Sequence, residues 1–458
     1  MKEKLIELVH SEASTAAEVH THILQMEEHD IAEAFDDLDT AKAVKLFRLL
    51  PKNIAADVFA HIDTDVQQTI IETITDKEQA AIINDLFADD AVDLIEEMPA
   101  GVVRRLLKNA SPEVRDDINF LLKYPEGSAG SIMTVEYIRL KQHHTVKHAF
   151  DIIHEHGVNK KSIYTCFVTD DKKTLIGFVS VRDLLLAKPS ATIGELMTSA
   201  VIHLHTTDDQ EHVADQFKKY GFMSMPVVDS EDKLVGVITV DDVLHVIEEE
   251  HTEDISKMAG LKPLETSYLK ASVLRHSRNR IMWLMILLVS AFLTGSVISG
   301  FENALVAMPI LMVFIPMLMD TAGNAGSQSS AQIIRSMALG EITPKIWLNV
   351  LWKEVRVALL CGLGMGIVVF GRIMLLDNLA FQSTITDGIN QAFGIACTVT
   401  LALCITVLIA KVLGCLFPIL AKLVRIDPAL MAAPLITTIA DVLSLLVYFG
   451  LATLFLTF

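Results

Sequence analysis

The sequence has little cysteine and none of the short motifs that mark common enzyme families. Its five cysteines include no C-x-x-C pair, and four of them lie in or beside apolar runs. They therefore read as small apolar residues, not as disulfides or a zinc site. No G-x-S-x-G, Walker A or H-E-x-x-H motif is present. These absences argue against an enzyme and against ATP-driven pumping, because such a pump needs a phosphate-binding loop.

Positive charge is also scarce, and it is distributed unevenly. The 458 residues contain 38 Lys and Arg against 57 Asp and Glu, a net charge of −19. Residues 1–272 hold 27 basic and 49 acidic residues, whereas residues 273–458 hold 11 and 8. The first part should therefore repel nucleic acid and attract cations. It begins without an apolar signal segment, so we expect it to stay in the cytoplasm.

The cytoplasmic part predicts two kinds of domain. In residues 1–127, apolar residues recur at three- and four-residue spacing, which favours an all-α domain of stacked helical hairpins. Residues 128–245 contain two copies of one pattern, each with an MT start, a helix, two strands around an acidic turn and a closing helix. The copies resemble a tandem pair of α/β CBS domains. That resemblance implies a nucleotide position at Arg182 and Asp183, with ATP as a modulator.

The remaining sequence predicts a connecting helix over 246–272, broken near Gly260, and an all-α membrane domain over 273–458. Five apolar segments are long enough to cross a bilayer, which takes about 20 residues each. Their expected positions are about 281–300, 305–334, 355–376, 391–418 and 430–457, with Gly414 and Pro418 ending the fourth. The basic loops fall on one side if the N-terminus is cytoplasmic, so we expect the C-terminus outside.

Two polar sites interrupt the apolar segments. The second segment reads PMLMDTAGNAGSQSS over residues 316–330. Its candidates for an ion pathway are Asp320, Gly323, Asn324 and Gln328. Polar groups inside a bilayer must face protein or water, so we expect this stretch to face a pathway. Helix packing through small residues is the alternative explanation for the glycines.

Asp441 is the only charged residue of the fifth segment and the strongest candidate for a cation site. A lone carboxylate in the membrane is costly unless it is paired or hydrated, and we expect no basic side chain in mid-membrane to pair with it. Thr437 and Thr438 lie four and three residues before it, on nearly the same helical face. Such oxygen ligands suit hydrated Mg²⁺, while Mn²⁺, Co²⁺ and Ca²⁺ stay open. A protonated Asp buried between helices is the alternative.

The order of the parts, with GNAGSQSS in the second segment and DPALMAAPLITTIAD at the fifth, resembles the MgtE family of magnesium channels or transporters over essentially the full length. The resemblance implies a homodimer in the cell membrane that imports Mg²⁺ through a pore between two membrane domains. It implies that Asp441 binds the ion and that Asp427 lies at the cytoplasmic mouth. The regulatory Mg²⁺ ligands that it implies are Asp89, Asp93, Asp242, Glu250, Glu253 and Asp254.

Some positions depart from the family pattern and leave the number and affinity of regulatory sites open. They are His245, Ala433 and the stretch that contains Lys218, Lys219 and Gly221. The linker carboxylates Glu250, Glu253 and Asp254 crowd one helix, where like charges repel. A bound divalent cation would relieve this repulsion and favour a compact, closed sensor.

Three other functions stay open on the sequence. They are a less selective transporter of divalent cations such as Mn²⁺ and Co²⁺, a membrane enzyme or a transporter of another solute such as an anion that carries a CBS pair, and a Mg²⁺ sensor that transports nothing. The lone carboxylate in the fifth segment disfavours an anion pathway, and five interrupted apolar segments are more than a sensor needs.

Overall fold

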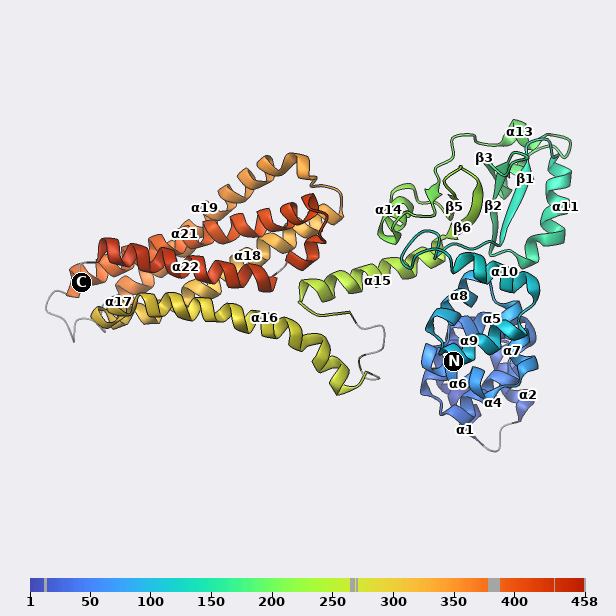
Figure 1. Ribbon diagram of the computed structural model, residues 1–458, viewed down its shortest axis with the longest axis horizontal. Coiled ribbons are helices and arrows are strands. Elements are labelled where there is room, and N and C mark those ends of the chain that lie inside the picture. The colour runs from blue at the N-terminus through green and yellow to red at the C-terminus, as the bar shows by residue number, and fades with distance from the viewer. Residues whose placement is uncertain (12–14, 264–267, 269–270, 378–387, 432, 457–458) are drawn as a thin grey trace. The chain divides into compact units, whose positions relative to one another are not determined.

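In the computed structural model, the chain forms two compact units, residues 1–248 and residues 249–458. The structure describes residues 1–11, 15–263, 268, 271–377, 388–431 and 433–456. The first unit contains the helical domain and the two α/β copies, and the second contains the long apolar helices (Figure 1).

The first unit begins with short helices that share one apolar core, in which Leu46, Phe59 and Ile70 are fully buried. Polar residues start several of them: Thr75 and Glu78 form a capping box, and Ser111 caps a helix that begins at Pro112. The elements are α1 (Lys2–His10), α2 (Ala16–Ile23), α3 (Glu28–Glu33), η1 (Ala34–Asp37), α4 (Thr40–Leu49), α5 (Lys52–Ala60), α6 (Thr64–Thr73), α7 (Asp76–Asp85), α8 (Ala88–Glu97), α9 (Ala100–Asn109) and α10 (Pro112–Leu121).

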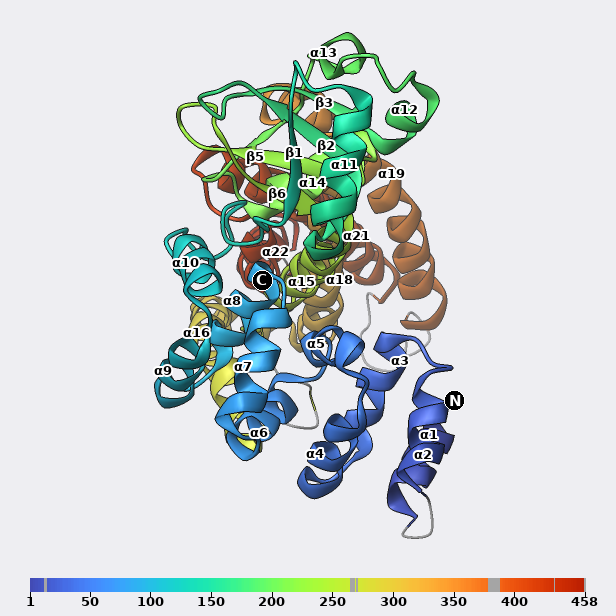
Figure 2. The ribbon, with the colours of Figure 1, turned by 90° about the vertical axis from the view of Figure 1, so that its right-hand side faces the viewer.

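The two α/β copies each contain a three-stranded sheet, in the orders β1-β2-β3 and β4-β5-β6. In each sheet the first pair of strands is parallel and the second antiparallel, so the duplication seen in the sequence is also one of topology. Figure 2 shows α11 against the first sheet. The elements are β1 (Tyr137–Lys141), α11 (Val146–His156), η2 (Gly157–Asn159), β2 (Ser162–Thr169), β3 (Leu175–Ser180), α12 (Val181–Leu186), α13 (Ile193–Leu196), β4 (Leu204–His205), α14 (Gln210–Tyr220), β5 (Ser224–Val228) and β6 (Leu234–Thr239).

The connecting helix differs from its predicted range. Helix α15 (Val240–Met258) begins directly after β6 and ends two residues before Gly260, whose φ is +68°. A side chain at Gly260 would also collide with the Trp283 ring, because a Cβ there would lie 2.2 Å from Trp283 Nε1. Position 260 therefore requires glycine for two independent reasons, the positive φ and the close approach of Trp283. The helix therefore ends near Gly260, where the sequence predicts a break in the segment 246–272.

Among its described residues, the second unit contains five helices that are long and apolar enough to cross a membrane, as the sequence predicts. Helices α18, α21 and α22 pack against one another, α19 packs against α21, and α16 lies along α22 (Figure 1). The fourth does not end at Gly414 or Pro418: α21 continues through Pro418 to Leu423. The elements are α16 (Val273–Gly300), α17 (Glu302–Ala307), η3 (Pro309–Phe314), α18 (Ile315–Ala338), η4 (Pro344–Ile346), α19 (Trp347–Arg372), η5 (Ile373–Asp377), α21 (Gly388–Leu423), η6 (Pro428–Met431) and α22 (Ala433–Phe455).

Glycines allow three of these helices to approach closely. A Cβ on Gly414 of α21 would lie 2.3 Å from the carbonyl oxygen of Gly326 on α18. On the α22 side, a Cβ on Gly326 would meet Ile436 at 2.6 Å, and one on Gly323 would meet Thr437 at 2.8 Å. This packing accounts for glycine at both α18 positions, as expected where helices associate without a hydrophobic driving force.

Candidate ion pathway and cation sites

Helix α18 carries a polar stripe inside the apolar unit. Asp320, Asn324 and Gln328 are spaced four residues apart, so they lie on one helical face. All three are exposed, whereas Gly323 and Gly326 on another face are buried against α21 and α22. The structure therefore separates the predicted pathway residues of α18 into a polar open face and a glycine packing face.

Asp441 lies on α22 with one carboxylate oxygen unsatisfied. Its Oδ1 is buried and has no hydrogen-bond partner in the described part of the chain. Asp320 of α18 is close enough to interact with it electrostatically, so these two carboxylates of the membrane unit lie near each other. Two carboxylates and an unpaired buried oxygen are an arrangement that a cation would stabilise.

The two threonines before Asp441 have different surroundings. The Thr437 methyl group is the nearest neighbour of Gly323 on α18, which places Thr437 on the α18 side. The Thr438 hydroxyl donates to the Pro434 carbonyl at 3.0 Å within its own helix. Thr438 also lines an open cavity of about 200 Å³ between α22 and α16. Of the two threonines, only Thr437 therefore lies on the side of α22 that faces α18 and the predicted pathway.

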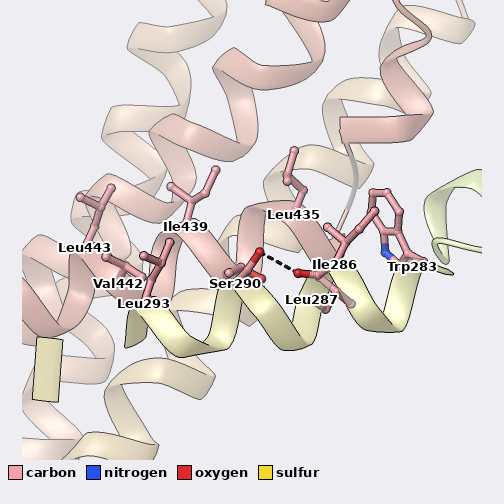
Figure 3. Close-up of a pocket in the computed structure, with 10 residues that line it drawn as sticks. Trp283, Ile286, Leu287, Ser290, Leu293, Leu435, Ile439, Val442 and Leu443 are labelled. Atoms are coloured by element: carbon pink, nitrogen blue, oxygen red, sulfur yellow. Dashed lines mark hydrogen bonds between the residues drawn. The ribbon is translucent and has the colours of Figure 1, made fainter. Parts of the chain in front are cut away.

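That cavity is apolar and is distinct from the polar stripe. Leu435, Ile439 and Val442 of α22 border it opposite Trp283 and Ile286 of α16 (Figure 3). The hydroxyl of Ser290, a polar residue at its edge, donates back to the Ile286 carbonyl at 2.9 Å. Trp283 Nε1 has no hydrogen-bond partner in the described residues, but an indole N–H only donates, and no acidic side chain is among the described residues that line this cavity. The cavity therefore has no carboxylate to bind a cation.

The expectation that no basic side chain lies in mid-membrane was wrong. Lys411 is buried in α21, and its ammonium donates to Ser329 Oγ of α18 at 3.2 Å. Ser329 in turn donates to Glu354 Oε2 of α19 at 2.7 Å. The Ser329 hydroxyl of α18 thus links the Lys411 ammonium of α21 to the Glu354 carboxylate of α19. The described partner of Lys411 is Ser329 and not Asp441, so Asp441 still lacks a counter-charge of its own.

At the junction of α15 with the membrane unit, a lysine bridges two predicted metal ligands. Lys257 Nζ lies 2.7 Å from Asp427 Oδ2 and 2.9 Å from Glu253 Oε2. Burial disfavours the ammonium, but hydrogen bonds to Asp427 and Glu253 outweigh burial and raise the pKa of Lys257. Burial, together with the nearby charge of Asp427, raises the pKa of Asp254.

A second lysine lies among the predicted ligands of the first unit. Lys161 Nζ donates to Asp89 Oδ2 on α8 and, at 2.7 Å, to Asp242 Oδ1 on α15. Asp90 Oδ1 is 3.8 Å away. Asp89 and Asp90 lie in the first turn of α8, and Asp242 lies in that of α15, where helix N-termini favour carboxylates.

The remaining acidic group of this cluster is Asp93, one turn further along α8. Burial and then repulsion from Asp89 and Asp90 raise its pKa to about 7. Asp89 Oδ1 is buried without a hydrogen-bond partner in the described residues. The cluster therefore has more negative charge than the single Lys161 neutralises.

The other predicted sensor residues are less closely grouped. Arg182 is exposed, and Asp183 accepts a 2.6 Å hydrogen bond from Ser180 in the capping box of α12. Asp183 therefore has a structural role at the start of this helix. Glu250 lies partly buried on α15, and His245 is exposed one turn before it.

Sequence reasoning missed Lys161, Lys257 and Lys411. Lys411 had a visible signal, because it is the only charged residue of the fourth apolar segment. Lys257 also had one, since it follows Glu253 by four residues on a helix. Lys161 had no such signal in the sequence, because its partners Asp89 and Asp242 are 72 and 81 residues away along the chain.

Comparisons with known proteins identify each part. A model of the MgtE divalent cation transporters matches residues 315–451, one of the MgtE intracellular N domain matches 26–127, and one of the CBS domain matches 129–190 and 193–249. The crystal structure of the soluble part of a magnesium transporter covers 55% of this chain and 99% of its own, with a TM-score of 0.51 and 28% identity.

Relatives that match over more than nine tenths of this chain are also magnesium transporters. The chain is 32% identical over 431 residues to the magnesium transporter MgtE of Thermus thermophilus, covering 93% of this chain and 92% of that protein. The chain is 31% identical to the magnesium transporter MgtE of Bacillus subtilis, and the match covers 94% of this chain and 92% of that protein. Enzymes match only in part, as does the inosine-5'-monophosphate dehydrogenase of Aquifex aeolicus over 34% of this chain. The chain is therefore no enzyme but a multi-pass membrane protein, and it belongs to the MgtE family of magnesium transporters.

Proposed function

We propose that the protein imports Mg²⁺ selectively along the polar face of α18, with Asp441 of α22 holding the hydrated ion. The observation that carries this proposal is the buried, unpartnered Oδ1 of Asp441 beside the stripe of Asp320, Asn324 and Gln328. Mg²⁺ keeps several of its waters and is usually held by one or two carboxylates, which is the number of acidic groups present here.

The exposed stripe also supports a homodimer. Asp320, Asn324 and Gln328 are exposed on the single chain, yet polar side chains in mid-membrane cannot face lipid. A second copy facing this stripe would cover it and enclose a water-filled pathway between two membrane domains. We place the N-terminus in the cytoplasm and the C-terminus outside, because the basic loops then share the cytoplasmic side.

For regulation we retain the division into a helical domain (1–127), a CBS pair (128–245), a connecting segment (246–272) and a membrane domain (273–458). Mg²⁺ on the cytoplasmic carboxylates would favour a compact, closed state, and its loss would favour conduction. The predicted ligands are Asp89, Asp93, Asp242, Glu250, Glu253, Asp254 and Asp427. ATP in the cleft near Arg182 is a further expectation that rests on the family resemblance alone.

The decisive experiment is Mg²⁺ uptake into liposomes that contain purified variants. Asp441→Asn keeps the side-chain volume but removes the charge, so it should lose most of the uptake or of the selectivity for divalent ions. Asp441→Glu should keep part of the activity, because its charge remains. Asn324→Ala should cost less, since it removes one hydrogen-bonding partner, about 1 kcal/mol.

Glu302→Gln is the matched control, because Glu302 is an exposed acid of α17 outside the polar stripe. Uptake and selectivity like those of the wild type in Asp441→Asn would exclude Asp441 from the pathway. A less selective transporter is the alternative function, and Mn²⁺ and Co²⁺ uptake in the same liposomes distinguishes the two.

A further inference from the structure

The first turns of helices α8 and α15 both contact the buried side chain of Lys161. Helix α8 belongs to the helical domain, and α15 follows the second CBS copy. Lys161 lies at the start of β2 in the first copy, and its backbone N–H donates to the Glu136 carbonyl at 3.2 Å. Its side chain is 9% exposed and that of Asp89 is 7% exposed. The three residues therefore meet where the helical domain and both CBS copies come together.

The ammonium occupies the position between the carboxylates. An ammonium has three protons to donate, and Lys161 Nζ bonds Asp89 Oδ2 and Asp242 Oδ1 at the same time. A lysine side chain is ordinarily charged at neutral pH. Its two hydrogen bonds to carboxylates therefore place a positive charge between the helical domain and the CBS pair.

A divalent ion does not fit the same position. Mg²⁺ would need carboxylate oxygens at about 2.0–2.1 Å. Asp89 Oδ2 and Asp242 Oδ1 already accept from Lys161, and Asp242 Oδ2 accepts from Thr239. Asp89 Oδ1 is the one oxygen of the pair without a partner in the described residues. A second cation beside a buried ammonium would also be strongly repelled, since charges interact strongly where water is excluded. Mg²⁺ and Lys161 must therefore compete for this pair.

We propose that Lys161 is a built-in cation that holds α8 to the CBS pair without a metal ion between Asp89 and Asp242. Contact between the helical domain and the CBS pair is then independent of Mg²⁺ at this position. This inference rests on the proposed regulatory function, and it moves the Mg²⁺ response of the sensor to carboxylates other than this pair.

Removing the ammonium should convert the position into a Mg²⁺-dependent one. Asp89, Asp90 and Asp242 would remain, with Asp93 behind them, and a buried acidic group without a counter-charge is strongly destabilising. In Lys161→Gln the carboxylates should therefore repel one another until a divalent cation binds. Lys161→Arg keeps the charge and should keep the contact.

The test is hydrogen–deuterium exchange of peptides from α8 and from the start of α15 in the full-length protein, with a chelator and with Mg²⁺. Wild-type protection in these peptides should be the same in both conditions. In Lys161→Gln exchange should accelerate at least tenfold in chelator and slow again in Mg²⁺, because the buried pair is broken. Lys160→Gln is the matched control, since Lys160 is the neighbouring lysine in the sequence and its charge acts on Asp117.

Wild-type peptides that lose protection in chelator and regain it in Mg²⁺ would overturn the proposal, and this measurement needs no variant. Lys161→Gln peptides that stay as protected as those of the wild type in chelator would overturn it as well. The readout is independent of ion flux, so failure of the transport proposal at Asp441 would leave this result interpretable.

Discussion

At the residue scale, the buried lysine of the membrane unit has a defined partner set. Lys411 and Glu354 are joined through the hydroxyl of Ser329, so each helps to offset the cost of burying the other. Polar bonds of this kind also hold membrane helices together where lipid supplies no hydrophobic drive. The group therefore holds α21, α18 and α19 in one register.

A double-mutant cycle tests this coupling. Lys411→Met and Glu354→Leu should each destabilise the protein by about 1–3 kcal/mol, because each removes one hydrogen-bonding partner of the Ser329 hydroxyl and one of the two charges. The double variant should lose less free energy of unfolding than the sum of the two single losses, by at least about 1 kcal/mol. Thermal unfolding of the purified protein in detergent measures all three, and strictly additive effects would show that the groups are not coupled.

A second prediction at this scale concerns acid. The backbone N–H of Thr75 donates to Glu78, Arg48 adds a charged hydrogen bond, and together they lower the pKa of Glu78 to about 2 from its ordinary 4.5. Ionised Glu78 therefore stabilises the folded state fully above pH 4.5. That contribution is lost as the pH falls from 4.5 through 2.

Glu78→Gln should flatten this acid dependence and should speed hydrogen exchange in α7 at neutral pH, because the capping carboxylate is gone. Exchange of α7 peptides between pH 6 and pH 3, corrected for the intrinsic rate, checks the prediction. Glu72→Gln is the control, since Glu72 is an exposed acid on the neighbouring helix α6. An equal acid response in the wild type and Glu78→Gln would contradict the assignment.

At the scale of elements, the contact between α18 and α21 depends on one glycine pair. A Cβ on Gly414 would lie 2.3 Å from the Gly326 carbonyl oxygen, and backbone cannot move away as a flexible side chain can. Gly414→Ala must therefore separate the two helices, at a cost of about 1–3 kcal/mol or more. The same shift would displace the polar stripe of α18 from Asp441.

Gly364→Ala is the matched control for this prediction, because Gly364 lies in α19 and a Cβ there would meet nothing within 4 Å. Gly414→Ala should lower the melting temperature in detergent and reduce Mg²⁺ uptake, whereas Gly364→Ala should leave both close to the wild type. Equal behaviour of the two variants would mean that α18 and α21 do not pack through this pair.

At the scale of the whole molecule, the cytoplasmic part should restrain the membrane part. Deletion of residues 1–127, or combined Glu250→Gln, Glu253→Gln and Asp254→Asn, should raise ion flux when internal Mg²⁺ is high. Lys257 already pairs with Glu253, and we propose that Mg²⁺ supplies the remaining positive charge that holds these carboxylates together. Neutralising them would then remove the dependence of the closed state on Mg²⁺. Flux into liposomes at graded internal Mg²⁺ measures the effect.

The control for the triple variant removes three acids that are exposed in the helical domain. They are Glu3, Glu7 and Asp36. Neutralising them changes the net charge equally but should leave the Mg²⁺ response intact, because exposed acids are well solvated. A triple linker variant that conducts less than the wild type at every Mg²⁺ level, while folding normally, would refute the inhibitory role.

The sequence by itself determined the order of domains, the duplication and the five membrane helices. Each of these follows from a local pattern, namely helical periodicity, internal similarity or an apolar run. The same holds for the stripe of Asp320, Asn324 and Gln328, because four-residue spacing places side chains on one face wherever the helix lies. Local patterns failed at Pro418, where neighbouring helices allow α21 to continue through a proline that would end a helix in water.

Only the tertiary structure decided which charges are partnered. Lys161 meets Asp89 and Asp242 across 72 and 81 residues, and Lys411 meets Ser329 across 82. A charge pattern shows how many carboxylates need a cation, but the three-dimensional path of the chain determines which cation reaches them. For Asp89 and Asp242 that cation is a side chain of the protein itself, whereas Asp441 keeps an oxygen without a partner in the described residues.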